Sequence, residues 1–199
     1  LSQVLDLGGE IEVGEVVRAE RIDGGFAAYT QEGDRFEGAA LILAPGVKHR
    51  HLGLINEDAL AGNGVCYCAV CDGDFYRGHD VIMVGGGNSA LQEALLLADT
   101  CSHVTVVQNL DFFTGEPPLA EALLRRENVR VLFGTVVTAL NEENGALCGC
   151  VVRRTATGES ETLAADGLFV SIGLEPQNGA FASLAALDEA GYFAADETC

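Results

Sequence analysis

The stretch 78–109, GHDVIMVGGGNSALQEALLLADTCSHVTVVQN, decides the fold of this chain. Its apolar run Val81–Val84 predicts a buried strand, which a turn of three glycines follows. Apolar residues then recur at helical spacing over Ser89–Leu97, and a second apolar run, Val104–Val107, predicts another strand. Strand, glycine turn, helix and strand in about thirty residues predict a βαβ unit.

The glycine turn has the spacing Gly85-x-Gly87-x-x-Ala90 between a predicted strand and a predicted helix. The first glycine permits a tight turn, the second lets a pyrophosphate approach the backbone, and the small Ala90 lets helix and strand pack closely. The free N–H groups at the helix start would face the phosphates. An ordinary glycine-rich turn is the alternative, but this context favours dinucleotide binding, with these candidate residues: Gly85, Gly86, Gly87, Asn88, Ser89 and Ala90.

The end of the second predicted strand should decide which dinucleotide binds. That position holds Gln108 and Asn109 and offers no arginine for a 2′-phosphate. A neutral Gln108 can hydrogen-bond a ribose without attracting a phosphate. Arg125 and Arg126 are the alternative cations, but they lie on a predicted helix face, where charged side chains are usually solvated.

The rest of the chain completes an α/β plan. A helix begun by Pro117 precedes a third strand, Val129–Phe133, and further short strands follow with turns such as Asn144-Gly145. Upstream, residues 10–46 predict an antiparallel meander whose last strand is the buried apolar run AALILAPG, residues 39–46. We therefore expect a Rossmann-like three-layer domain, with a central parallel sheet plus a β-meander.

Charge and composition exclude several classes of function. Thirty acidic residues against eleven Lys and Arg give a formal charge of −19, which repels nucleic acid and anionic lipid. No apolar run is long enough for a membrane span and the first residues are not a signal peptide, so we expect a cytoplasmic protein without membrane or nucleic-acid partners. The chain starts with Leu1 and ends on ADETC, which we interpret as a piece of a longer protein.

The segment CYCAVCDGDF, residues 66–75, could be a metal clip, a structural disulfide or a redox thiol pair. Zinc needs four ligands, and the nearest other thiols, Cys148 and Cys150, are predicted to share one face of a strand. We expect no metal. Cys68 and Cys71 have the spacing of a pair that alternates between dithiol and disulfide.

The neighbours of this pair leave alternatives open. Asp72 is either a proton donor and acceptor for the leaving thiolate or a helix N-terminal acid that interacts with the helix dipole. Cys66 and Cys101 are predicted to be small buried hydrophobic residues, and neither they nor Cys199 has a partner visible in the sequence.

Three segments together resemble bacterial low-molecular-weight thioredoxin reductases: YCAVCDGDFYRGHDVIMVGGGNSALQEALLLA (67–98), VVTAL (136–140) and GLFVSIGLEPQN (167–178). The resemblance covers nearly the whole chain. It implies a flavoprotein in which a pyridine-nucleotide domain carries the redox disulfide and is inserted into an FAD domain. Residues 1–57 would be a partial FAD domain, 58–173 the NAD(P)-binding domain, and 174–199 the start of a returning FAD segment.

The resemblance also implies roles for single residues. Cys71 would meet the flavin, Cys68 would attack the disulfide of thioredoxin or a similar dithiol protein, and Asp72 would be the acid/base group. Ile172 and Gly173 would join the glycine turn in holding NADP or NAD. A homodimer is the implied assembly.

Departures from the family pattern keep other functions open. Gln108-Asn109-Leu110-Asp111 and Thr114 replace the arginines of NADPH-using members, and Ala44-Pro45-Gly46 replaces an Ala-Thr-Gly near the flavin. An NADH-using alkyl hydroperoxide reductase flavoprotein, a ferredoxin-fed reductase and a non-catalytic nucleotide or thiol sensor are therefore alternatives. Because the first glycine fingerprint of the FAD domain would precede Leu1, we expect this chain to bind FAD weakly or not at all.

Overall fold

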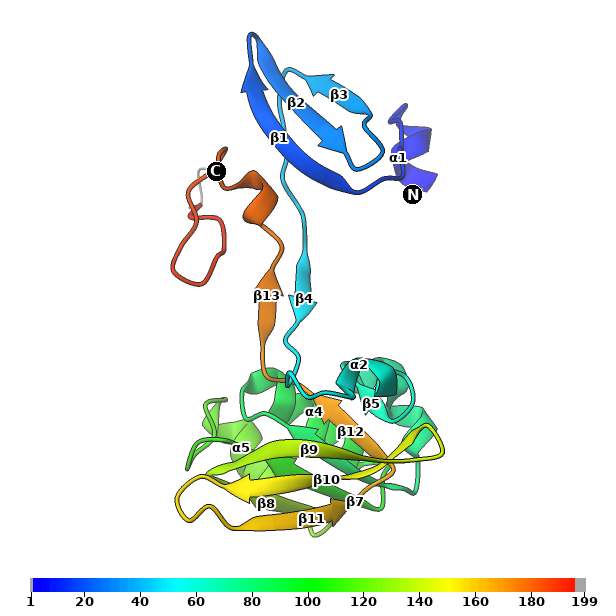
Figure 1. Ribbon diagram of the computed structural model, residues 1–199, viewed down its shortest axis with the longest axis vertical. Helices are drawn as coiled ribbons and strands as arrows, with labels where there is room; N and C mark the ends of the chain where they lie inside the picture. Colours follow the sequence, from blue (N-terminus) through cyan, green and yellow to red (C-terminus); the bar gives the residue numbers. More distant parts are fainter. Residues whose placement is uncertain (1, 196–199) are drawn as a thin grey trace. The chain divides into compact units, whose positions relative to one another are not determined.

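The structure is a computed structural model that describes residues 2–195 and consists of two compact units (Figure 1). Unit 2 is His49–Leu174, and unit 1 comprises the residues up to Lys48 and from Glu175 onward. The domain boundaries expected from the sequence are 57/58 and 173/174, whereas the units of the structure meet at 48/49 and 174/175. The main difference is therefore at the first boundary. Residues 49–57 lie with unit 2 because the buried carboxylate of Glu57 binds the backbone of that segment.

A five-stranded parallel sheet forms the centre of unit 2, in the order β5-β12-β6-β7-β8. Its strands are β5 (Val65–Cys66), β6 (Asp80–Val84), β7 (His103–Val107), β8 (Val129–Leu132) and β12 (Gly167–Val170). Both faces of the sheet are covered, which explains why β6 and β12 are apolar along nearly their whole length. The predicted strands of the βαβ unit and the strand after it are confirmed.

Helices pack on one face of this sheet. They are α3 (Ala69–Asp72), the 3-10 turn η1 (Gly73–Tyr76), α4 (Asn88–Ala98) and α5 (Pro117–Leu124). Val81 and Met83 of β6 point into this layer and pack with Leu91 and Leu97 of α4. The helix begins at Asn88, one residue before the predicted start, and α5 begins at Pro117 as predicted.

An antiparallel meander covers the other face (Figure 1). Its strands β9 (Thr135–Glu143), β10 (Ala146–Arg154) and β11 (Ser160–Ala164) pair in the order β11-β10-β9. Ile82 and Val84, the alternate residues of β6, pack against this meander together with the short helix α2 (Glu57–Leu60). Alternation along one strand thus fills both layers, and the expected three-layer nucleotide-binding architecture is confirmed.

The prediction that Cys148 and Cys150 share one face of a strand is wrong. Leu147 pairs with Glu142 and Gly149 with Asn141, so Cys148 is an extra residue in a β-bulge of β10. Gly149 has φ +141°, and a Cβ there would overlap the carbonyl oxygen of Leu163. The bulge leaves Cys148 exposed and Cys150 fully buried.

Unit 1 contains an antiparallel three-stranded sheet in the order β1-β2-β3, as the meander pattern predicts. Its elements are α1 (Ser2–Asp6), β1 (Val16–Ile22), β2 (Gly25–Thr30), β3 (Arg35–Gly38) and the 3-10 turn η2 (Gly179–Phe181). The strands β4 (Val47–His49) and β13 (Leu174–Pro176), where the chain crosses between the units, pair with each other.

One predicted strand of unit 1 is wrong. The third strand is Arg35–Gly38, which follows its turn directly, and the apolar run 39–46 is irregular with Ile42 92% exposed. Among residues 2–195 no strand pairs with this run, so its apolar side chains have no sheet to pack on.

Within the described residues, no helix is long and apolar enough to cross a bilayer.

Candidate functional site

The glycine turn between β6 and α4 has a geometry that only glycine can adopt at its first position. Gly85 has φ +134°, and a Cβ there would overlap the carbonyl oxygen of Ser171. The methyl group of Ala90 lies beside the same position, so a larger residue at 90 would separate helix from strand. The first helical bond runs from Leu91 N–H to the Gly87 carbonyl, which leaves the N–H groups before Leu91 without helical partners.

A cavity of about 790 Å³ opens over this turn. Its volume is typical of small-molecule sites. All ten residues predicted to bind the cofactor line it: Gly85, Gly86, Gly87, Asn88, Ser89, Ala90, Gln108, Asn109, Ile172 and Gly173. The structure therefore brings together three strand ends that lie far apart in the sequence.

Gln108 closes one end of the cavity. It is 4% exposed, its side-chain amide lies against Gly86, and its Nε2 donates to the carbonyl oxygen of Phe112 at 3.0 Å. The backbone N–H groups of Thr114 and Gly115 both donate to the Gly86 carbonyl, at 2.9 and 3.0 Å. The loop after β7 is thus fastened over the glycine turn, and the residues lining this end are uncharged: Gln108, Asn109, Leu110 and Thr114.

The two arginines considered as alternative cations point elsewhere. Arg125 pairs with Glu121 at 3.0 Å and Arg126 with Asp99 at 2.8 Å, and neither lines the cavity. Both side chains are exposed, but Arg125 is the C-cap of α5 and Arg126 follows it, so they lie at the end of the helix and not on the predicted helix face.

Sequence reasoning missed the opposite side of the cavity. His49, Arg50 and His51 line it, and the side chain of Arg50 lies over Gly173. Glu93, in the second turn of α4, lines it as well. A signal was present, because Lys48-His49-Arg50-His51 is a dense run of basic residues in a strongly acidic chain.

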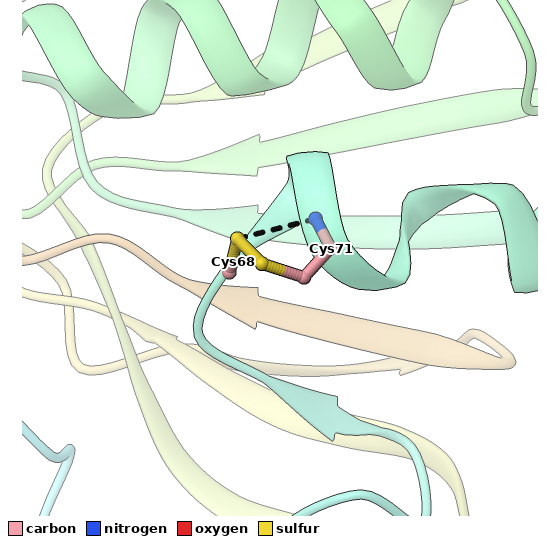
Figure 2. Close-up of a disulfide and its surroundings, with 2 residues drawn as sticks. All are labelled: Cys68 and Cys71. Atoms are coloured by element: carbon pink, nitrogen blue, oxygen red, sulfur yellow. Dashed lines mark hydrogen bonds between the residues drawn. A yellow bond between two sulfur atoms is a disulfide. The ribbon is translucent and has the colours of Figure 1, made fainter. Parts of the chain in front are cut away.

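Cys68 and Cys71 form a disulfide at the start of α3 (Figure 2). Neither residue lines the cavity. Cys68 is the N-cap of α3, in an extended conformation, and its Sγ accepts from the backbone N–H of Cys71 at 3.1 Å (Figure 2). Cys71 is exposed and Cys68 is partly exposed, so a reaction partner can reach the bond. The predicted helical turn and pairing are confirmed.

Asp72, directly after the pair, faces Cys66. The buried thiol of Cys66 lies 3.5 Å from the hydroxyl of Tyr76, whose ring packs edge-on against Phe169 at 5.3 Å. Burial raises the pKa of Cys66, and the Asp72 carboxylate adds to that rise. Cys66 is therefore a protonated thiol beside Asp72, and the predictions that Cys66 and Cys101 are buried are confirmed.

A second polar cluster lies beside Cys68 and was also missed. The carboxylate of Glu57, 1% exposed, accepts from the N–H groups of Leu52 and Gly53, each at 2.8 Å, and from the Tyr67 hydroxyl at 2.9 Å. Burial and the Glu57 hydrogen bond raise the pKa of Tyr67. The ring of His51 stacks on Tyr67 at 4.7 Å. The cluster fixes the segment that joins the cavity rim to the redox pair.

Over residues 2–195, no three His, Cys, Asp or Glu side chains gather in a way that could hold an ion. Cys199 lies outside the described residues.

Comparisons with known proteins give a consistent result. A sequence profile described as pyridine nucleotide-disulphide oxidoreductase matches residues 3–199. The thioredoxin reductase of Listeria monocytogenes is 33% identical over 198 residues, 99% of this chain and 61% of the relative, and that of Bacillus subtilis is 34% identical over 186 residues. The solved thioredoxin reductase of Lactococcus lactis superposes with a TM-score of 0.86 at 29% identity, over 98% of this chain and 64% of that one.

Proposed function

Because the chain belongs to the pyridine nucleotide-disulphide oxidoreductase family, we propose that it is the nucleotide-binding and disulfide-bearing part of a thioredoxin reductase. The chain spans about 61% of the length of the curated relative from L. monocytogenes. The proposed activity of the full-length protein is electron transfer from a pyridine nucleotide through FAD to the Cys68–Cys71 disulfide, and then to thioredoxin. One observation carries it: the disulfide and the nucleotide cavity belong to the same compact unit.

The cavity fits a pyridine dinucleotide. The unpaired N–H groups at the start of α4 suit the pyrophosphate, and Gly87 leaves open space where a side chain would obstruct it. The uncharged Gln108 end suits a ribose with free hydroxyls. We therefore assign NADH rather than NADPH as the electron donor, which when bound supplies a hydride.

FAD, when bound by the full-length protein, would supply the relay between nicotinamide and disulfide. Among the described residues of unit 1, no glycine turn joins a parallel strand to a helix as residues 85–90 do in unit 2. We assign the flavin cradle to the remainder of the full-length protein.

The chain's own residues carry the thiol chemistry. Reduction of the disulfide takes two electrons, and we infer that Asp72, which follows Cys71 in the sequence, hands one proton to the Cys71 sulfur as the bond opens and leaves Cys68 as a thiolate. The Cys68 thiolate then attacks the disulfide of thioredoxin and forms a mixed disulfide. Cys71 then returns its proton to Asp72 and attacks Cys68 as a thiolate, which re-forms the Cys68–Cys71 bond and releases thioredoxin, whose two sulfurs take up protons to give the dithiol.

The assembly and compartment are part of the proposal. We assign the full-length protein to the cytoplasm, because the unpaired thiols Cys66, Cys101, Cys148 and Cys150 suit a reducing environment. A homodimer is the assembly that the family resemblance implies, and sedimentation of the full-length protein tests it.

The test of the activity uses the full-length protein with FAD, thioredoxin and NADH. Cys68→Ser and Cys71→Ser should each abolish NADH-dependent reduction of thioredoxin, whereas Cys148→Ser, at an exposed thiol away from the pair, should leave it unchanged. Reduction of thioredoxin that persists in Cys71→Ser would refute the proposal.

A further inference from the structure

Arg50 lines the nucleotide cavity beyond the end of β12. Its backbone N–H donates to the Gly173 carbonyl at 3.0 Å, which fastens the segment before α2 to the chain that leaves β12. A Cβ at Gly173 would lie 3.7 Å from Arg50 Cδ and 3.9 Å from both Nε and Nη1. The absence of a side chain at Gly173 therefore leaves the guanidinium room to lie over this backbone.

The same stretch of backbone touches the glycine turn. A Cβ at Gly85 would overlap the carbonyl oxygen of Ser171, whose N–H donates to the Val84 carbonyl at 2.9 Å. Gly173 follows Ser171 by two residues, and two residues of chain span at most about 7 Å. A dinucleotide bound at the turn is therefore within reach of the Arg50 side chain.

Arg50 also differs in charge from its neighbours in the cavity. Among the described residues that line it, the titratable side chains are His49, Arg50, His51 and Glu93. Of these, only Arg50 carries a full positive charge at every working pH. The chain has a formal charge of −19 and repels an anion such as NADH. A guanidinium in the cavity offsets that repulsion at the place where the ligand binds.

The charge of NADH lies on its pyrophosphate, because its rings and ribose hydroxyls are neutral. A guanidinium matches phosphate oxygens with a planar fork of N–H donors. On the basis of the proposed function, we propose that Arg50 is a nucleotide-binding residue that holds the pyrophosphate against the glycine turn from the side of Gly173. Because NADH and NADPH share the pyrophosphate, Arg50 strengthens the binding of both, and the choice between them belongs to the Gln108 end.

Calorimetry of the 199-residue protein tests this with the wild type, Arg50→Gln and Arg153→Gln. Arg153 is exposed on β10 and does not line the cavity, so its variant loses the same charge elsewhere. The ligands are NADH, NADPH and ADP-ribose, which has the pyrophosphate but no nicotinamide. Arg50→Gln should raise Kd about tenfold for all three, and Arg153→Gln should leave it unchanged. Arg50→Lys keeps the charge without the fork, so its Kd should lie between wild type and Arg50→Gln.

Three outcomes of these titrations would overturn the inference. The first is an NADH affinity that Arg50→Gln does not change. The second is a loss confined to NADPH, which would place Arg50 at the 2′-phosphate. The third is a loss for NADH without a loss for ADP-ribose, which would place Arg50 at the nicotinamide.

A second measurement uses the wild type and does not depend on a variant folding. Phenylglyoxal modifies arginine side chains, and fragment mass spectrometry follows Arg50 and Arg153 separately. Saturating NADH and inorganic pyrophosphate should each slow the modification of Arg50 severalfold, adenosine should not, and Arg153 should react at one rate throughout. An unchanged rate at Arg50 with NADH bound would overturn the inference, as would protection by adenosine but not by pyrophosphate.

The two proposals fail in different ways. If the wild type binds neither NADH nor NADPH in the calorimeter, the proposed function fails. If the wild type binds NADH while Arg50 stays unprotected, only the role of Arg50 fails.

Discussion

The backbone N–H of Cys71 donates to the Sγ of Cys68 across 3.1 Å, inside the turn that the disulfide closes. After reduction the same N–H can stabilise a thiolate at Cys68, the residue that caps α3. The turn packs against α4, and the N-terminus of α4 lines the cavity. The proposed redox pair and the proposed nucleotide site thus belong to two neighbouring helices.

Gly87→Ala should weaken NADH binding without loss of stability. Gly87 has an ordinary φ of −84°, and the nearest atom to an added Cβ is Thr114 Oγ1 at 3.8 Å. The protein itself tolerates the methyl group, but a pyrophosphate does not, so calorimetry should show Kd raised by about tenfold or more. Gly179→Ala, in open space in unit 1, is the matched control. Unchanged affinity in Gly87→Ala would place the pyrophosphate elsewhere.

The nucleotide preference is tested by titrating the chain with NADH and NADPH at the same low salt. NADH should bind about tenfold more tightly, because the lining at Gln108 offers no cation to a 2′-phosphate. Thr114→Arg should raise the affinity for NADPH, and Thr157→Arg, an exposed turn position, should not. Tighter NADPH binding by the wild type would mean that a cation such as Arg50 reaches the phosphate.

Alkylation of the native protein should separate the four unpaired thiols within residues 2–195. Cys148 is exposed on its bulge, whereas Cys66, Cys101 and Cys150 are buried, and burial raises the pKa of Cys150 to about 12. At neutral pH Cys148 should react about a hundredfold faster than the other three, as read by mass spectrometry. All four should react alike after unfolding. Equal rates for Cys148 and Cys150 in the native protein would contradict the bulge.

Glu57→Ala should destabilise unit 2 by about 3 kcal/mol, because it leaves the N–H groups of Leu52 and Gly53 and the Tyr67 hydroxyl without their acceptor. Urea unfolding measures the change. Asp58→Asn, at a side chain 89% exposed, is the control and should cost less than about 1 kcal/mol. If Glu57→Ala lowers the free energy of unfolding no more than the control does, the cluster around Glu57 does not fix the rim of the cavity.

The sequence predicts unit 2 well because its signals are local. Uninterrupted apolar runs indicate strands covered on both faces, and the spacing of Gly85, Gly87 and Ala90 indicates both the turn and the cavity above it. Periodicity fails where one residue is inserted, as at Cys148, because the alternation of faces restarts after a bulge. It also fails for residues 39–46, because an apolar run becomes a buried strand only if a neighbouring strand pairs with it.

The sequence also does not identify the buried carboxylates. Glu57 and Glu93 are indistinguishable from surface acids in a chain with thirty acidic residues. Glu57 is held by a turn with Leu52–Leu54 and by Tyr67, and Glu93 faces Ala69 and His49, which come from other segments of the chain. Only the folded arrangement places those partners together.

The most direct test of the central claim is a count of thiols in the unfolded chain before and after mild reduction, in the wild type and in Cys71→Ser. The account predicts that reduction adds two thiols to the wild type and none to the variant, and that oxidised thioredoxin removes the two again. A wild-type count that reduction does not change, or that oxidised thioredoxin does not reverse, would contradict the assignment of Cys68 and Cys71 as the pair that carries electrons.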